Sequence, residues 1–454
     1  MGTRTYFIKL VCFTAILSLC FVQVAGAGTK WDYDPYNGMI MLLKTLPPWL
    51  EMGADFRFRV VYDNDRHLDN QAIGHDRLNT RYRGRVQAKI KQSEDFAYNF
   101  RIVSEPRYYH RPPSMNKQFT HHEGIFDRFN FVWQNAFDLP ATVTVGRQEI
   151  KLGSAWLLID GTPLDGGRTN FFDAVRLTYN LEGWGTTADL IWVQNNGDTA
   201  KWLKPFNDRD IDVAEQDEQG AILYLSKKPT ENSYIDGYFI YKHDYDRNVS
   251  SGYKGETYTF GTRLGDKLGE HWQYCFEFAP QFGHKNGKEL SSFATNNEVI
   301  YHFNDEDKNR IHFGYEYLSG SDDPDKNFDK VWGRVDTWSV LYQGPIDSID
   351  GRQIDSSNLH RIHLGWVTEP SEKWEIKSAY HLLFADENTS AGGTGGLSKG
   401  GNFRGQLLRA QIKYKVSEHI YHRLEGELFF PGDFYNDDRN DVAVFARYGI
   451  VFTW

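Results

Sequence analysis

The sequence predicts an all-β fold, namely an 18-stranded antiparallel transmembrane β-barrel with short periplasmic turns and long extracellular loops. The first observation is alternation: from Thr80 to Lys91, basic or polar side chains alternate with Tyr82, Val86 and other small or apolar residues. Alternate side chains of a strand point to opposite faces, so this segment needs water on one face only. Such segments recur along the chain with aromatic residues on the apolar face, and the last one ends on Trp454. A membrane barrel with a wet interior accounts for all three observations.

The N-terminus has the order of residues typical of a secretory signal peptide. Two basic residues precede an apolar run over residues 10–24, and small residues follow up to Ala27. We therefore expect residues 1–27 to be removed and residues 28–454 to form one barrel domain. Cys275 would then be the only cysteine of the mature chain, which excludes an intramolecular disulfide.

No later segment approaches the roughly 18 consecutive apolar residues that a membrane-spanning helix requires. A closed barrel is the other structure that can cross lipid, because it satisfies every backbone hydrogen bond internally. The mean hydropathy of −0.59 agrees with a barrel, since half of each strand is polar. The 15% aromatic content would supply interfacial girdles.

Alternation and turn residues predict the strands in order along the chain. They are expected at 52–62, 80–91, 96–105, 127–136, 141–148, 173–180, 186–194, 219–227, 233–242, 256–264, 271–279, 293–303, 309–318, 358–367, 373–384, 404–416, 419–429 and 442–454. A further candidate at 334–342 would make the number odd, whereas bacterial single-chain barrels have an even number. Short connections alternate with long ones without a break only if 334–342 lies inside a loop. We expect long loops to include 280–292 and a Gly-rich connection at 385–403.

Assigning the apolar face of each strand to lipid turns many basic side chains toward the lumen. These candidate pore-lining residues are Arg57, Arg59, Arg81, Arg83, Arg85, Arg101, Arg128, Arg176, Arg263, Arg361, Arg409, Arg423 and Arg447. The whole chain is acidic, with 61 Asp and Glu against 51 Lys and Arg, and acidic residues gather in connections such as 208–218 and 322–329. An electropositive channel concentrates anionic solutes.

The segment from Val145 to Tyr179 resembles the alginate export family of outer-membrane barrels. The matching parts are Gly146-Arg147-Gln148, Asp160-Gly161-Thr162-Pro163 and Phe172-Asp173-Ala174-Val175-Arg176-Leu177. The resemblance implies an 18-stranded monomeric porin whose arginine-lined channel passes an anionic uronic-acid polysaccharide without an energy source of its own. It also implies constriction residues, namely Arg147, Arg168 and Arg176 with Asp165 and Asp173 as counter-charges.

Guanidinium groups pair with carboxylates in a planar, bidentate way, so a ladder of arginines suits a polyuronate. In the alternative interpretation, Asp173 and Arg176 form a purely structural ion pair. The direction of transport, export or uptake, stays open.

Other motifs give weaker signals for metal binding or catalysis. Asp323, Asp325, Asn327 and Asp329 have the alternate spacing of a calcium loop, but Phe328 stands where an EF-hand needs glycine. We expect no cofactor, with loosely bound surface calcium left open. Adjacent His121 and His122 diverge in an extended chain, and Ser154 lacks the second glycine of a nucleophile elbow.

These patterns predict a passive anion-selective channel in the bacterial outer membrane rather than an enzyme. Two alternatives remain: a barrel enzyme of the deacylase or lipase type, and an exported carbohydrate-binding β-sandwich. The expected partners are an anionic polysaccharide and outer-membrane lipid, with periplasmic export-complex proteins as further candidates. We expect a monomer that binds no nucleic acid.

Overall fold

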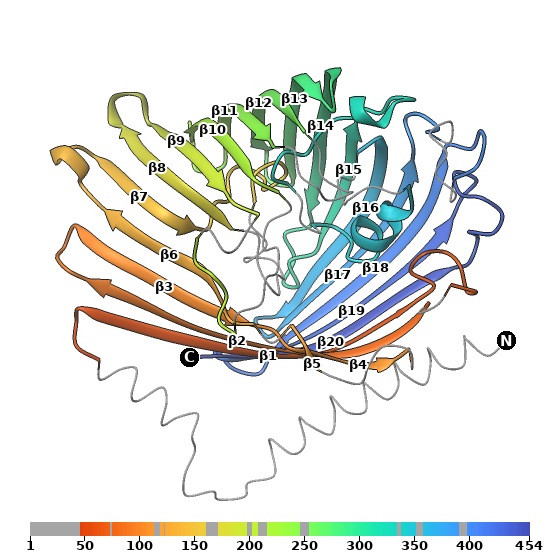
Figure 1. Ribbon diagram of the computed structural model, residues 1–454, viewed down its shortest axis with the longest axis horizontal. Coiled ribbons are helices and arrows are strands. Elements are labelled where there is room, and N and C mark those ends of the chain that lie inside the picture. Colours follow the sequence, from red (N-terminus) through yellow and green to blue (C-terminus); the bar gives the residue numbers. More distant parts are fainter. Residues whose placement is uncertain are drawn as a thin grey trace, which may run out of the picture. The chain divides into compact units, whose positions relative to one another are not determined.

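The computed structural model describes residues 46–72, 75–112, 119–121, 123–159, 171–197, 202–207, 216–245, 254–333, 337–350, 357–389 and 397–454, without the side chains of Ser348 and Asp350. Of two compact units, the one spanning Pro48–Thr453 contains all the described strands (Figure 1). The expected signal peptide lies outside the described residues. Among those residues, no helix has both the length and the apolar character that a membrane crossing requires.

The described residues form one antiparallel sheet of long strands that closes on itself. The strands are β1 (Leu50–Asn64), β2 (Asp76–Lys91), β3 (Phe96–Ser104), β4 (Arg107–Arg111), β5 (Phe119–Thr120), β6 (Ile125–Trp133), β7 (Ala141–Gln148), β8 (Phe172–Leu181), β9 (Thr186–Asn195), β10 (Glu218–Lys227), β11 (Tyr234–Asp244), β12 (Gly255–Leu268), β13 (Trp272–Lys285), β14 (Lys288–His302), β15 (Arg310–Leu318), β16 (Leu359–Ser371), β17 (Trp374–Phe384), β18 (Phe403–Lys415), β19 (Ile420–Pro431) and β20 (Ala443–Thr453). Short helical turns are η1 (Ala136–Asp138), η2 (Glu182–Trp184), η3 (Pro324–Lys326), η4 (Tyr342–Ile346) and η5 (Asp347–Asp350).

The barrel wall consists of 18 of these strands. β4 extends the pairing of β3 with β2, and the two-residue β5 pairs with β4, so neither adds a separate strand to the wall. β1 pairs with β20 from Asp55–Thr453 to Asn64–Val444, which closes the sheet. The predicted fold class and strand number are confirmed.

Each of the 18 predicted strands overlaps a strand of the wall. The candidate at 334–342 is not a strand in its described part, Thr337–Tyr342, which lies in the connection between β15 and β16. One predicted loop is wrong, because β13 and β14 continue through 280–292 and leave a turn of only Asn286 and Gly287. Both turn residues have positive φ, 51° and 79°, as a two-residue hairpin of type I′ requires.

Side-chain burial separates the two faces of the wall. On β1 and β2, Phe56 and Val86 are 38% and 55% exposed, whereas Arg57 and Arg83 on the opposite face are 3% and 5% exposed. The exposed face is apolar and suits contact with lipid. The opposite face lines the barrel interior, where two inserted segments contact it.

Parts of two long connections fold into this interior and form a core with the wall. The first inserted segment, residues 149–159, contributes buried Trp156 and Leu158. The second, the described residues 328–333 and 337–350, contributes Phe328, Trp332 and Tyr342. The two segments meet in a short parallel bridge between Leu158 and Trp332. Figure 1 shows the helical turns η4 and η5 by the blue strands, where Arg404 of β18 donates to the Tyr342 hydroxyl over 2.9 Å.

Candidate functional site

Glu105 gathers three arginines on the interior face of the first strands. Arg57 of β1 lies 2.5 Å from this carboxylate, Arg81 of β2 also pairs with it, and Arg107 of β4 lies 3.7 Å away. Glu105 sits in the break between β3 and β4 and has no exposed surface. Three cations around one carboxylate leave an excess of positive charge there.

A second group continues this basic surface along β1, β2, β19 and β20. Asp55 bridges Arg83 and Arg85 at 2.9 and 2.5 Å. Glu425 of β19 pairs with Arg447, lies 2.6 Å from Arg409 and lies 3.6 Å from Arg423, and these three arginines come from three neighbouring strands. Arg59, which is 4% exposed, lies on the same face between Arg57 and Val61. Alternation places these arginines on the interior face of the wall.

The remaining arginines of the interior face each have a carboxylate partner. Arg101 holds Asp127 in a two-bond pair at 2.8 and 3.0 Å and reaches Glu149 at 2.7 Å, which Arg128 also contacts. Burial would raise the pKa of Glu149, but the two arginines outweigh it and hold this pKa below its usual value. Separate pairs join Arg176 to Asp189 at 2.7 Å, Arg263 to Asp236 at 2.9 Å and Arg361 to Glu316 at 2.7 Å.

Arg147 and Asp173 differ from the predicted arrangement. They pair with each other across β7 and β8 through two hydrogen bonds of 2.8 Å, and the Phe171 ring covers the guanidinium at 3.5 Å. Asp173 therefore pairs with Arg147 and not with Arg176. Both members share the sheet face of Val145 and Val175, which are 41% and 46% exposed, so alternation separates them from Arg176 and the interior arginines.

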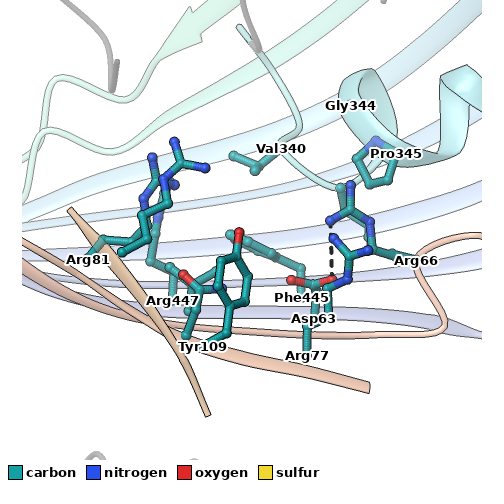
Figure 2. Close-up of a pocket in the computed structure, with 14 residues that line it drawn as sticks. Asp63, Arg66, Arg77, Arg81, Tyr109, Val340, Gly344, Pro345, Phe445 and Arg447 are labelled. Carbon is teal, nitrogen blue, oxygen red and sulfur yellow. Dashed lines mark ion pairs between the residues drawn. The ribbon is translucent and has the colours of Figure 1, made fainter. Parts of the chain in front are cut away.

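A pocket of about 240 Å³ opens between the basic wall and the second inserted segment. Its lining is Val61, Asp63, Arg66, Arg77, Asn79, Arg81, Arg107, Tyr109, Val340, Leu341, Gly344, Pro345, Phe445 and Arg447. Figure 2 shows Arg81 and Arg447 extending toward Val340, while Arg66 lies near Gly344 and Pro345 and pairs with Asp63 at 3.6 Å. Five arginines against one aspartate give this pocket a strong positive charge. We call it the arginine pocket.

A second pocket of about 200 Å³ lies beside Trp338, against strands β14 to β18. Here Glu298 reaches His312 and His363, both at 3.3 Å, and the ring of His381 lies 5.2 Å from that of Trp338. These histidines were not among the predicted site residues. Strand alternation could have indicated them, because His363 and His381 share the interior face of their strands with Arg361 and Leu383.

The remaining predicted sites are either outside the described residues or have ordinary structural partners. Asp165, Arg168 and the 160–163 loop lie outside the described residues. Asp323 and Asp325 pair with Lys288 at 2.9 and 3.0 Å, and the described residues contain no group of three ligands that could hold a metal ion. Ser154 donates a hydrogen bond of 2.5 Å to Glu277, which is not the histidine partner that a serine nucleophile usually needs.

Comparisons with known proteins identify a family and a shared fold. The family described as alginate export matches residues 48–448. Similar folds occur in Acinetobacter baumannii OccAB1 (9% identity, 89% of this chain and 96% of that chain, TM-score 0.58) and in Pseudomonas aeruginosa OccK7 (OpdD) (10% identity, 90% and 99%, TM-score 0.56). P. aeruginosa OccK9 (OpdG) is similar at 10% identity, with 89% and 98% of the chains covered and a TM-score of 0.56. A search of curated proteins gives no match.

Proposed function

Because the chain belongs to the alginate export family and forms an outer-membrane β-barrel, we propose that it is a passive anion-selective channel. Its substrate would be an anionic uronic-acid polysaccharide or oligosaccharide that passes along arginines of the barrel interior. The arginine pocket is the observation that carries this proposal, because five guanidinium groups and one carboxylate line a cavity inside the wall. Guanidinium forks suit the carboxylates of a polyuronate.

The closed barrel wall excludes one of the two alternative interpretations, the carbohydrate-binding β-sandwich. A β-sandwich has two separate packed sheets, whereas here β1 pairs with β20, so the sandwich interpretation is wrong. The enzyme alternative has no specific support, since the hydroxyl of Ser154 is bound to Glu277. A monomeric state, periplasmic export-complex partners and loosely bound surface calcium remain predictions.

Planar-bilayer recordings in a gradient of potassium chloride test the proposal. We expect chloride to be more permeant than potassium, and we expect a polyuronate to block the current. Substituting Arg81→Gln together with Arg447→Gln should lower the chloride-to-potassium permeability ratio by at least about twofold, since a lining charge shifts local ion concentrations exponentially.

A matched control is Arg111→Gln. Arg111 is 53% exposed at its side chain and pairs with Asp76 at the end of β4. Its substitution removes one of the two charges lost in the double variant, but outside the pocket, so the ratio should stay close to that of the unmodified protein. Equal permeation of the two ions through the unmodified protein, or equal effects of the two sets of variants, would contradict the proposal.

A further inference from the structure

Four glutamates of the barrel wall bind donor groups of the two inserted segments. Glu218 of β10, Glu277 of β13, Glu316 of β15 and Glu427 of β19 all point to the interior, and their side chains are at most 5% exposed. A carboxylate in this position would normally attract cations into a channel. What covers these four groups therefore matters for selectivity.

The first inserted segment covers two of them. The Ser154 hydroxyl donates to Glu277 over 2.5 Å, and the Trp156 indole nitrogen donates to Glu316 over 2.7 Å. Both donors are uncharged and come from one turn of chain that follows β7. Arg263 and Arg361 of the wall lie 4.0 and 2.7 Å from Glu277 and Glu316, so each carboxylate has a charged wall partner and an uncharged donor from the segment.

The second inserted segment covers the other two. The Trp332 indole nitrogen donates to Glu218 over 3.0 Å, and its ring packs so closely on β10 that a Cβ at Gly220 would lie 2.4 Å from it. Glu427 accepts from the Ser339 hydroxyl at 2.6 Å and from the backbone N–H groups of Val340 and Leu341 at 3.1 and 3.0 Å. Val340 and Leu341 also line the arginine pocket.

Three arginines of the arginine pocket are more open than these glutamates. The side chains of Arg81, Arg107 and Arg66 are 18%, 25% and 25% exposed. Glu298 is a more open interior acid, because its side chain is 32% exposed and its contacts come from histidines of the wall. Other interior acids, such as Glu105 and Glu425, are buried by arginines of the wall, whereas the four glutamates also receive uncharged donors from the inserted segments.

We propose that Ser154, Trp156, Trp332 and Ser339 are specificity-determining residues that withdraw four wall carboxylates from the permeation path. The path is left beside the basic strands β20, β1 and β2. This inference rests on the proposed anion channel and names the residues that set its selectivity. The donors act through the glutamates, so they are positioning residues that need not touch the substrate.

The experiment is a cycle of substitutions measured as reversal potentials in planar bilayers. Trp156→Phe with Trp332→Phe removes two N–H donors while keeping aromatic rings and net charge. We expect this pair to lower the chloride-to-potassium permeability ratio by about twofold, because Glu316 and Glu218 become hydrated and reach the path. Adding Glu316→Gln and Glu218→Gln should restore the ratio.

The same two glutamine substitutions in the otherwise unmodified protein supply the critical comparison. They should shift the ratio much less there, whereas Glu298→Gln, at an open carboxylate, should raise it. The inference fails if the tryptophan substitutions leave the ratio unchanged, or if the glutamine substitutions act equally in both backgrounds. A loss of selectivity that the glutamines do not restore would also overturn it, since it would reflect a wider pore.

Failure of the channel proposal gives a different result. If the unmodified protein passes both ions equally, the anion-selective function is wrong, yet the tryptophan substitutions should still shift the reversal potential toward potassium. Heat-modifiable migration of each variant in SDS gels confirms that the barrel has folded before it is recorded.

Discussion

Arg147 and Asp173 form a buried ion pair whose members depend on each other. Arg147 is 2% exposed and also donates to the Phe126 carbonyl over 2.8 Å. Removing one partner of a buried pair leaves an uncompensated charge, at a cost of about 3 kcal/mol. We therefore expect Asp173→Ala to lower the free energy of unfolding by roughly that amount, as measured by urea unfolding in detergent micelles.

The chloride-to-potassium permeability ratio of the Asp173→Ala variant should equal that of the unmodified protein, because the pair lies on the sheet face away from the arginine pocket. The double substitution Arg147→Met with Asp173→Leu serves as the control, since an apolar pair of similar size leaves no charge unpaired. A change in the chloride-to-potassium ratio for Asp173→Ala would show that the pair contributes to the permeation path.

The same residues show what sequence could predict at this scale. Alternation assigned Arg57, Arg81 and Arg447 to the interior because their neighbours on either side are apolar or small. Arg147 was assigned from a motif, which identifies a residue but not the face on which its side chain lies. Its parity with Val143 and Val145 was visible in the sequence and indicated the other face.

Among the elements, the β13–β14 hairpin depends on the conformation of its two turn residues. Gly287 has φ of 79°, which costs an L-residue about 1 kcal/mol. Gly287→Ala should therefore lower the free energy of unfolding by about 1 kcal/mol in the same urea assay. Gly84→Ala is the matched control, because Gly84 has no positive φ and an added Cβ meets nothing within 4 Å. Equal effects of the two substitutions would mean that the turn conformation is not the cause.

Strands were predictable and inserted segments were not, for a physical reason. A strand between lipid and water carries its period of two in its own residues. A segment such as 337–350 has no period and folds inward because of partners far away in sequence, such as Glu427, which is 88 residues from Ser339. The Asn-Gly turn at 286–287 was a local signal that the expectation of a long loop concealed.

For the whole molecule, the distribution of charge matters more than its sum. The chain carries a formal net charge of −10, yet the pocket between the wall and the second inserted segment is lined by five arginines and one aspartate. The wall closes through ten paired positions of β1 and β20, which hold Arg57 opposite Val451 and Val61 opposite Arg447. Closure thus joins the first and last strands into the basic surface that the proposed function uses.

Selectivity that arises from the electric field of these arginines should weaken as salt screens that field. The Debye length falls from about 10 Å at 0.1 M salt to about 3 Å at 1 M, which is shorter than the distance across a channel of this kind. We expect the chloride-to-potassium permeability ratio to fall toward one over that range, measured at a constant concentration ratio across the bilayer. The variant with Arg81→Gln and Arg447→Gln should show a shallower decline, since it has less field to screen. A ratio that stayed constant with salt would contradict this expectation. It would assign the selectivity to direct contact between ions and individual guanidinium groups, because such contacts are much less sensitive to screening than a field acting across the lumen.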